Sequence, residues 1–293
     1  MTARSYLYVP GNAPDKLAKA AGRGADALIV DLEDAVPHSG KIAARAAVAD
    51  WLSNLASSGG RPPGGPEIWV RINPGEAGHA DADAIARAAE GRALAGLCVA
   101  KTESAKEIEN LAKLLDAIET RSRLAPGAVA LTPLLESAAA LFAAPAIARA
   151  PRVVRLQLGE ADLAADLGVR PGPEARELLW ARSQVVAASA AAAITPPVSP
   201  VSVEIRDLDA FRESTHALAR LGFLGRACVH PAQIPVVHEV FTPSSELLAA
   251  AREVLARYQD ALTAGSAVCL DAHGRLVDEA VVRSARRVVE LAG

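Results

Sequence analysis

The chain has 293 residues, enough for one large domain with a sizeable core and an extension. Lys and Arg together number 31 and Asp and Glu 34, so the net charge is −3. This balance argues against a nucleic-acid partner or a membrane-surface partner, because both usually require a basic patch.

Apolar runs alternate with helix-like stretches through most of the chain. Eight short runs predict strands, at residues 6–9, 27–32, 67–72, 97–101, 128–135, 153–158, 201–205 and 226–229. Helical patterns separate them, at residues 14–21, 39–56, 81–93, 104–120, 138–149, 173–193 and 208–221. Alternation of this regularity favours a parallel α/β fold.

Residues 57–66 are rich in Gly, Pro and Ser and predict a surface loop. The loop follows a helix and precedes a strand, so we expect it at the amino ends of the strands, away from a site at their carboxyl ends. It lacks the Gly-Lys-Ser/Thr sequence of a phosphate loop, and no helix follows it directly.

The pattern changes after the eighth predicted strand. Residues 245–262 predict a strongly amphipathic helix, residues 271–274 a β-turn, and residues 279–292 a last helix. We therefore divide the chain into a barrel domain, residues 1–240, and a C-terminal helical extension, residues 241–293. The extension would pack on the barrel or reach over a neighbouring subunit as a lid.

Charged residues close many of the predicted strands, and one more lies just past the sixth. They are Asp31, Arg71, Lys101, Glu136, His230 and Asp162. Buried strands that all end in such residues are typical of a (β/α)8 TIM barrel, whose active site lies at the carboxyl ends of the strands. We therefore predict this α/β fold, followed by the helical extension.

Glu136 and Asp162 follow consecutive predicted strands. Neighbouring strands lie about 5 Å apart, so carboxylates at their ends can converge on one ion. Two carboxylates with waters and substrate oxygens suit Mg²⁺, with Mn²⁺ as an alternative, because Mg²⁺ takes few protein ligands. Spacing alone leaves a second interpretation open, in which Glu136 caps the next helix and Asp162 is solvated.

Arg71 ends the third predicted strand and would face the same opening. A planar cation there suits a carboxylate or a developing enolate, and a salt bridge with Asp31 or Glu33 is the alternative. Asp31, Glu33 and Asp34 form an acidic cluster that we assign to the substrate site. One or two of them would position a metal-bound water or Arg71.

Lys101 and His230 each allow two interpretations. Lys101 suits a Schiff base as in other barrel aldolases, but we favour an ion pair with Glu103 or Glu136. A carboxylate-rich opening would keep the amine protonated and poorly nucleophilic. His230 stands alone before Pro231, and we interpret it as structural rather than catalytic.

The three cysteines are far apart and form no CxxC pair, so we expect no zinc site. We interpret Cys98 and Cys228 as small buried side chains in a reducing compartment. The amino terminus lacks the apolar segment of a signal peptide, and the Ala-rich stretches are short or broken by Pro. We expect a cytoplasmic protein.

Seven short motifs occur in the order found in one family of enzymes. They are residues 7–12 (LYVPGN), 31–35 (DLEDA), 70–73 (VRIN), 101–104 (KTES), 135–137 (LES), 159–163 (GEADL) with 166–168 (DLG), and 230–234 (HPAQI). In these motifs the chain resembles citrate lyase β-subunit-like (CitE-like) proteins of the HpcH/HpaI aldolase superfamily, which includes the malyl-CoA and citramalyl-CoA lyases. The resemblance covers residues 4–290 or nearly so.

The resemblance implies a (β/α)8 barrel that binds Mg²⁺ through Glu136 and Asp162. It implies that Arg71 holds the α-keto acid or the enolate oxygen. It also implies an acyl-CoA substrate, with coenzyme A as part of it. Lys16 is our candidate contact to the coenzyme A phosphates, with Lys19 as a second.

The family also carries a catalytic Asp in a C-terminal motif, which trimeric members supply to the site of a neighbouring subunit. Residues 275–278 (RLVD) match that motif. The resemblance therefore makes Asp278 a candidate catalytic residue and gives the C-terminal extension a function.

The chain departs from the family pattern at several positions. Ala100 stands where Pro usually precedes the Lys of strand four, and Glu204 replaces an Asp. The usual order Gly-Ala-Glu-Asp becomes Gly-Glu-Ala-Asp at residues 159–162, which moves the Glu and keeps the Asp in place. Arg275 and Ala280 differ from the C-terminal motif. The metal ligands survive these changes, which bear on substrate choice and the lid.

These features predict a Mg²⁺-dependent carbon–carbon lyase with Arg71 and Asp278 as its catalytic residues. It would cleave or form a 3-hydroxyacyl-CoA, such as citryl-CoA, malyl-CoA or citramalyl-CoA, with a short acyl-CoA and an α-keto acid as the other partners. The alternatives are a class II aldolase acting on free hydroxy-keto acids without CoA, and a catalytically silent binding protein. We expect a homo-oligomer, either a trimer or a dimer of trimers.

Overall fold

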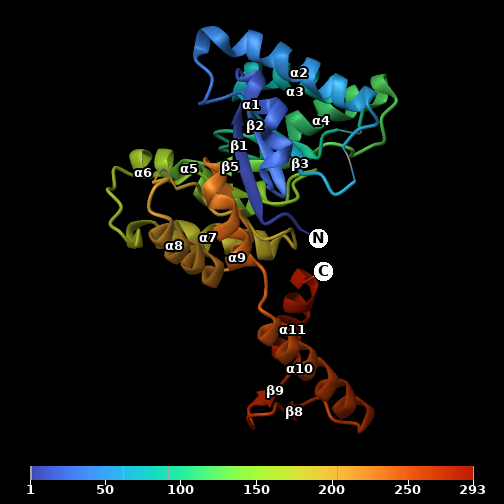
Figure 1. Cartoon of the computed structure of the whole chain (residues 1–293), viewed down its shortest axis with the longest axis vertical. Coiled ribbons are helices and arrows are strands. Elements are labelled where there is room, and N and C mark those ends of the chain that lie inside the picture. Colours follow the sequence, from blue (N-terminus) through green and yellow to red (C-terminus); the bar gives the residue numbers. More distant parts are fainter. Residues whose placement is uncertain (1, 62, 92, 203, 293) are drawn as a thin grey trace. The chain divides into compact units, whose positions relative to one another are not determined.

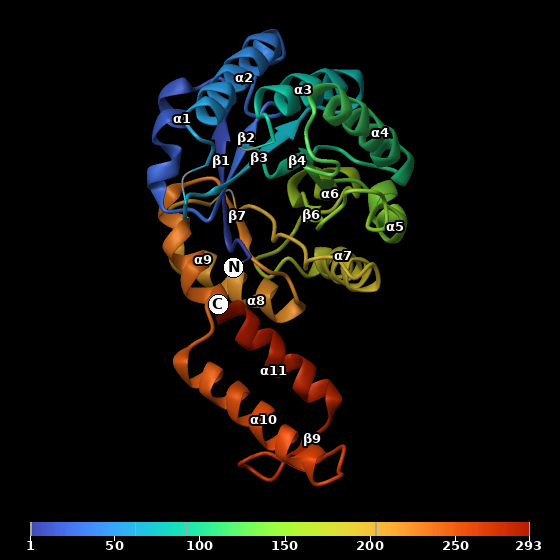
Figure 2. The ribbon, with the colours of Figure 1, turned by 90° about the vertical axis from the view of Figure 1, so that its right-hand side faces the viewer.

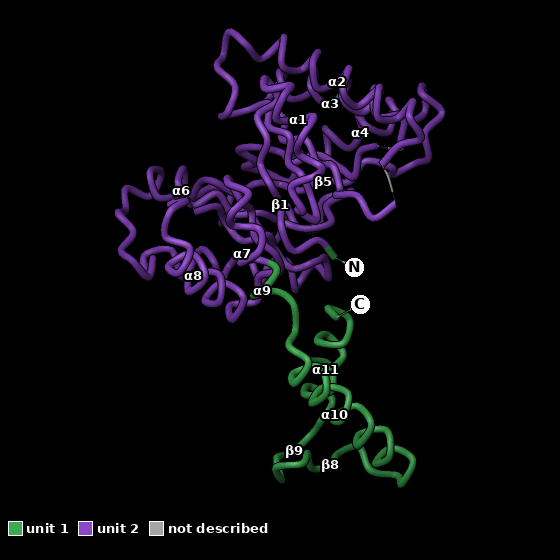
Figure 3. The backbone as a smooth tube through the Cα atoms, viewed as in Figure 1, with its two compact units in different colours: residues 1–2, 238–293 green, residues 3–237 purple. Residues whose placement is uncertain are grey.

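The computed structural model describes residues 2–61, 63–91, 93–202 and 204–292. The chain forms two compact units, a larger one of residues 3–237 and a smaller one of residues 1–2 and 238–293 (Figures 1 and 3). The sequence analysis placed the boundary between residues 240 and 241, whereas the larger unit ends at Val237.

A curled parallel sheet of seven strands forms the centre of the larger unit, in the order β6-β5-β4-β3-β2-β1-β7. The strands are β1 (Ser5–Pro10), β2 (Ala27–Asp31), β3 (Glu67–Ile72), β4 (Gly96–Val99), β5 (Ala130–Leu135), β6 (Gln157–Leu158) and β7 (Arg226–Cys228). All neighbouring strands are parallel, so their carboxyl ends meet at one edge. The predicted parallel α/β fold is confirmed.

Helices surround this sheet on its outer side (Figure 2). They are α1 (Pro14–Ala20), α2 (Lys41–Ser57), α3 (Gly75–Ala88), α4 (Ala105–Ser122), α5 (Ala138–Ile147), α7 (Leu179–Ala191) and α8 (Leu208–Leu221). The short helix α6 (Glu160–Asp166) follows β6 at the carboxyl ends of the strands. A further helix, α9 (Ile234–Phe241), spans the boundary between the two units.

The predicted strand at residues 201–205 is wrong for the residues that the structure describes there; Val203 lies outside them. Pairing occurs earlier instead, through isolated parallel bridges from Val198 to Gln157 and from Ser199 to Arg226. The bridges stop at Ser199, and Pro200, which follows, has no N–H to donate to a neighbouring strand. The sheet itself is open between β6 and β7.

Several helix boundaries also differ from the prediction. Helix α3 begins at Gly75 rather than at residue 81, because the extended Pro74 starts it early. Gly78 looks like a helix breaker in the sequence, yet it is required, since a Cβ there would lie 1.9 Å from the Asn73 carbonyl oxygen. Helix α7 begins at Leu179 instead of residue 173, and α6 and α9 were not predicted. Pro62 of the predicted surface loop lies outside the described residues; the rest of the loop joins α2 to β3 as expected.

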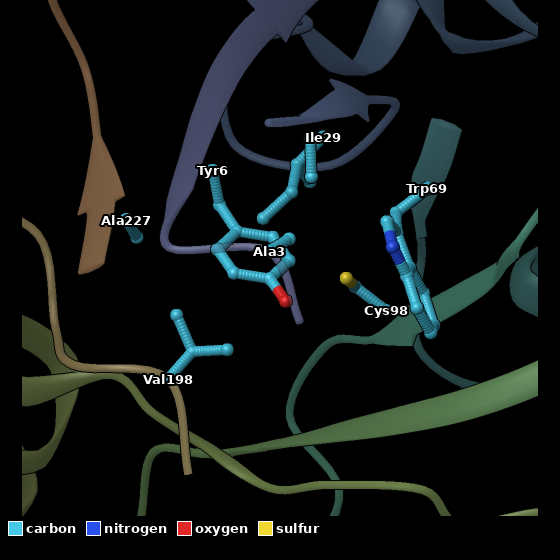
Figure 4. Close-up of a cluster of buried hydrophobic side chains, with 8 residues drawn as sticks. Ala3, Tyr6, Ile29, Trp69, Cys98, Val198 and Ala227 are labelled. Carbon is cyan, nitrogen blue, oxygen red and sulfur yellow. The ribbon is translucent and has the colours of Figure 1, made fainter. Parts of the chain in front are cut away.

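The inner face of the sheet is filled by buried side chains, several of them small (Figure 4). Tyr6, Ile29, Trp69 and Cys98 come from four successive strands and meet Val198 and Ala227 from the other side. Cys98 and Cys228 are buried and free, as predicted. The core therefore closes the amino end of the sheet interior and leaves the carboxyl ends for chemistry.

The smaller unit is a helical hairpin with a short antiparallel ribbon. It consists of α10 (Ser245–Thr263), β8 (Cys269–Leu270), β9 (Leu276–Val277) and α11 (Glu279–Ala292), with Tyr258, Val277 and Val282 at its centre. The predicted turn between the strands is confirmed by a hydrogen bond of 3.1 Å from Gly274 N–H to Asp271 O. Within the described residues, no helix has the length and apolar character needed to cross a membrane.

Candidate active site at the carboxyl ends of the strands

A cavity of about 900 Å³ opens where the strands end. Its size lies within the usual range of ligand sites. Seven residues that the sequence predicted for the site line it, namely Lys16, Lys19, Asp31, Asp34, Arg71, Glu136 and Asp162. Glu33 reaches this group by its ion pair with Arg71, whereas Asp278 belongs to the smaller unit.

Glu136 lies directly after β5 and is 6% exposed. Its Oε2 accepts a hydrogen bond of 2.9 Å from the N–H of Lys101, whose positive φ of 52° turns the backbone after β4. On the other side, Gly159 leaves room for the carboxylate, since a Cβ there would lie 2.6 Å from Oε1. Ser137 caps α5, so the interpretation of Glu136 as the cap is wrong.

Burial raises the pKa of Glu136 to about 7. The negative charge of Asp162 adds to this rise, while the Lys101 N–H and the Arg71 charge oppose it. The charged form of a carboxylate that is destabilised in this way is stabilised when a cation binds beside it.

Asp162 lies in the first turn of α6 and is exposed to the cavity. No hydrogen bond or ion pair joins its carboxylate to another part of the chain that the structure describes, so its oxygens are available to a ligand. Nowhere in the described ranges do three or more His, Cys, Asp or Glu side chains form a complete metal-binding group. Two carboxylates with free coordination positions for water and substrate fit Mg²⁺, which rarely takes a full set of protein ligands.

Arg71 faces Asp31 in register across β3 and β2. Its Nε and Nη2 donate to the two Asp31 oxygens, each at 2.7 Å, and the guanidinium lies 5.1 Å from the centre of the Tyr8 ring. Burial opposes the charge of Arg71, but the hydrogen bonds to Asp31 outweigh it and raise the pKa of Arg71. Arg71 is therefore a fixed cation.

The ion-pair interpretation of Arg71 matches this geometry, but the ion pair does not use all the N–H donors of the side chain. Asp31 and Asp34 together accept three hydrogen bonds from Arg71. An arginine has five N–H donors, so two more can turn to Glu33 or to a ligand in the cavity. Asp31 also accepts from the N–H groups of Glu33 and Ala35, so it holds Arg71 and the following loop at once.

Lys101 pairs with the acidic loop rather than with Glu103 or with the carboxylate of Glu136 as we expected. Its Nζ lies 2.6 Å from Glu33 Oε1 and 3.6 Å from Asp34 Oδ1. The side chains of Lys101, after β4, and Glu33, after β2, therefore meet past the end of β3, which lies between those strands. The hydrogen bond to Glu33 raises the pKa of Lys101, which keeps the amine protonated and disfavours a Schiff base.

A polar network behind the acidic loop was missed. Lys41 Nζ donates to the carbonyls of Leu32 and Glu33 and to Asn73 Oδ1, and Asn73 Nδ2 donates to Asp81 at 2.7 Å. Lys41 and Asp81 belong to α2 and α3, and a search for chemistry at strand ends does not reach them. Asn73, a polar residue two positions after Arg71, was the only sign of this network near a strand end in our sequence analysis.

A basic group lines one side of the cavity. Lys16 and Lys19 of α1 and Arg23 of the following turn are exposed there. Sequence analysis missed Arg23, although the spacing of three and then four residues places all of them on one helix face. His230 also lines the cavity, and its Nδ1 accepts from Ala232 N–H, which confirms a structural role as a cap.

Asp278 caps the last helix of the smaller unit. Its Oδ1 accepts hydrogen bonds from the N–H groups of Ala280 and Val281, at 2.9 and 3.0 Å. This role is sufficient to explain an Asp at this position. Catalysis by Asp278 stays a prediction.

Comparison with known proteins decides the family. The model of the HpcH/HpaI aldolase/citrate lyase family matches residues 4–231. The chain belongs to this family. As an HpcH/HpaI family member it is 31% identical to the citrate lyase subunit beta of Leuconostoc mesenteroides subsp. cremoris, over 99% of this chain and 93% of that protein.

Two further relatives of this HpcH/HpaI family member are informative. The L-malyl-CoA/beta-methylmalyl-CoA lyase of Cereibacter sphaeroides is 30% identical over 99% of this chain and 94% of its own length. The crystal structure of CitE from Mycobacterium tuberculosis, in complex with magnesium, acetoacetate and coenzyme A, superimposes with a TM-score of 0.75 at 29% identity. It covers 99% of this chain and 98% of that one. The predicted resemblance to lyases of this family is confirmed.

Proposed function

We propose that this family member is a Mg²⁺-dependent lyase that cleaves or forms a 3-hydroxyacyl-CoA of the citryl-, malyl- or citramalyl-CoA type. The observation that carries the proposal is one cavity that combines a buried carboxylate, Glu136, an exposed carboxylate, Asp162, and an anchored cation, Arg71. The relatives named as lyases of citrate and malyl-CoA support this reaction class.

Glu136 and Asp162 would hold Mg²⁺. When bound, this ion acidifies the substrate hydroxyl and stabilises the oxygens of the keto acid. The binding of magnesium in the related CitE structure supports this assignment. Lys101 and Gly159 define where the Glu136 carboxylate lies, through a hydrogen bond and through free space.

The chemistry assigned to the chain's own residues follows from their charge. In cleavage the substrate hydroxyl would give its proton to water in the cavity, the carbon–carbon bond would break, and its electron pair would move into the thioester to form an enolate. Arg71 would offset this developing negative charge, and its bonds to Asp31 mean that it needs no reorganisation. Asp278 would then give a proton to the enolate carbon, and take one from it in the reverse direction.

The basic group of Lys16, Lys19 and Arg23 would bind the phosphates of coenzyme A. We further propose that the chain forms a trimer or a dimer of trimers in which Asp278 serves its own or a neighbouring site. The bridges at Val198 and Ser199 support an eighth strand position between β6 and β7, and hence the predicted (β/α)8 barrel.

The test is turnover of defined thioesters by the purified protein. We expect malyl-, citramalyl- or citryl-CoA to give a short acyl-CoA and an α-keto acid by chromatography, with Mg²⁺ but not after EDTA treatment. Cleavage of free hydroxy-keto acids alone would favour the class II aldolase. Intact Mg²⁺ binding without turnover of any thioester would favour a silent binding protein.

A further inference from the structure

An ion pair holds the first turn of the helix that carries Asp162. Arg182 of α7 donates from Nε to Glu160 Oε1 at 2.5 Å and from Nη2 to Oε2 at 2.8 Å. The two side chains are only 12% and 16% exposed. A two-pronged Arg–carboxylate pair of this kind fixes orientation as well as distance.

The short helix α6 is attached at both ends. Glu160 is its first residue, and at its last residue Asp166 Oδ2 accepts a hydrogen bond of 2.7 Å from Ala138 N–H of α5. Asp162 lies between these attachments, and its own carboxylate has no hydrogen bond or ion pair to the described remainder of the chain. The direction in which Asp162 points therefore depends on how α6 is held.

We propose that Glu160 and Arg182 are positioning residues that aim Asp162 at the cation shared with Glu136. This inference rests on the proposed function, in which Asp162 is a metal ligand. Arg182 does not line the cavity, so its effect would pass through Glu160 and the first turn of α6. Second partners that orient a metal ligand in this way commonly contribute a factor of about 10 to 100 to metal affinity.

The pair of Glu160 and Arg182 gives a physical reason for the order Gly-Glu-Ala-Asp at residues 159–162, which differs from the family's Gly-Ala-Glu-Asp. Successive residues of an α-helix point about 100° apart. A Glu at position 161, as in the family order, would therefore not meet Arg182 as Glu160 does. In this chain Glu160 and Ala161 both line the cavity, and Glu160 anchors the helix through Arg182.

The experiment is a calorimetric titration of the whole purified chain with Mg²⁺ alone, with thermal unfolding of the metal-free protein measured beside it. We expect Glu160→Gln to weaken Mg²⁺ binding by about 10-fold. Arg182→Lys keeps the charge but loses the two-pronged geometry, so we expect a smaller loss. If Glu160→Gln does not fold, Arg182→Lys alone tests the positioning role.

A matched control is available at the opposite end of the sheet. Glu119 pairs with Arg152 by two hydrogen bonds of 2.7 and 2.6 Å, next to the amino ends of β5 and β6. Glu119→Gln should lower the unfolding temperature at least as much as Glu160→Gln and leave Mg²⁺ affinity unchanged. A role in stability alone would give the same Mg²⁺ affinity in both variants.

Asp162→Asn separates this inference from the proposed function. If it abolishes Mg²⁺ binding while Glu160→Gln and Arg182→Lys bind like the wild type, the positioning role is overturned and the metal site stands. If Asp162→Asn also binds like the wild type, the metal site fails, and the positioning role fails with it.

Discussion

Replacing Gly159 with Ala should weaken Mg²⁺ binding without unfolding the protein. A Cβ at this position would lie 2.5 Å from Glu136 Cγ and 2.6 Å from Oε1, and both distances are shorter than real contacts. The backbone at Gly159 has a φ of −103°, which Ala adopts without strain. The side chain of Glu136 must therefore yield.

The size of the effect follows from the distance that Glu136 must move. To reach an ordinary contact its atoms must retreat by about 1 Å. The hydrogen bond of 2.9 Å from the Lys101 N–H would then be lost. Hydrogen bonds to charged groups contribute about 1.5–3 kcal/mol, which corresponds to about a 10- to 100-fold change in an equilibrium constant. We expect Mg²⁺ affinity and kcat/KM to fall within that range.

Titration calorimetry with Mg²⁺, thermal unfolding and thioester turnover measure the three consequences. The matched control is Gly172→Ala, where a Cβ would lie at an ordinary 3.8 Å from a carboxylate oxygen of Glu177. We expect this control to match the wild type in all three measurements. Wild-type Mg²⁺ affinity in Gly159→Ala would refute the placement of Glu136 at the metal.

Glu136→Gln should stabilise the metal-free protein above pH 7. The pKa of Glu136 is about 7 in the folded protein and 4.5 ordinarily, so folding takes up a proton and wild-type stability falls as the pH rises from about 4.5 to about 7. The neutral amide of Gln avoids this loss. We expect the variant to gain about 3 kcal/mol in the free energy of unfolding, measured with denaturant at pH 8. Equal unfolding free energies at pH 8 would contradict this. Asp278→Asn should lower kcat and leave Mg²⁺ affinity unchanged, because Asn also caps a helix, and a wild-type kcat would remove Asp278 from the mechanism. Mixing Asp278→Asn with Arg71→Ala subunits should restore partial activity if Asp278 acts in a neighbouring site, and none if it acts in its own. Borohydride added with a keto acid should attach nothing to Lys101, and a covalent adduct found there by mass spectrometry would restore the Schiff-base interpretation.

Local patterns in the sequence were enough to predict the repeated architecture. Strands such as β2 and β5 are short apolar runs that end in a charge, and this pattern depends on burial alone. The region between β6 and β7 could not be predicted, because its pairing consists of two isolated bridges, at Val198 and Ser199, which are too short to leave a pattern in the sequence. Helix α6 was missed because it lacks a start signal: α1 is equally short but begins with a proline, whereas α6 has neither a proline at its start nor a side-chain cap.

Which residue types belong to the site was easier to predict than which of them pair. Arg71 and Glu136 line the cavity as expected, since both follow directly from strand position. The predicted partner of Lys101 was wrong, because its long side chain pairs with Glu33, which follows β2, past the end of the intervening β3. Pairs formed between loops depend on backbone paths that have no period in the sequence.

The charges of the site indicate what it is built to bind. Six carboxylates gather at one side against three cations. The carboxylates are Asp31, Glu33, Asp34, Glu136, Glu160 and Asp162, and the cations are Arg71, Lys101 and Arg182. Without a ligand this side carries an excess of negative charge, part of which appears as the raised pKa of Glu136. A divalent cation would offset most of that excess, and an anion alone would increase it. Lys16, Lys19 and Arg23 present the opposite charge across the same cavity. The arrangement therefore matches a ligand with a metal-binding acid at one end and phosphates at the other, which is the charge pattern of the hydroxyacyl-CoA that we propose as substrate.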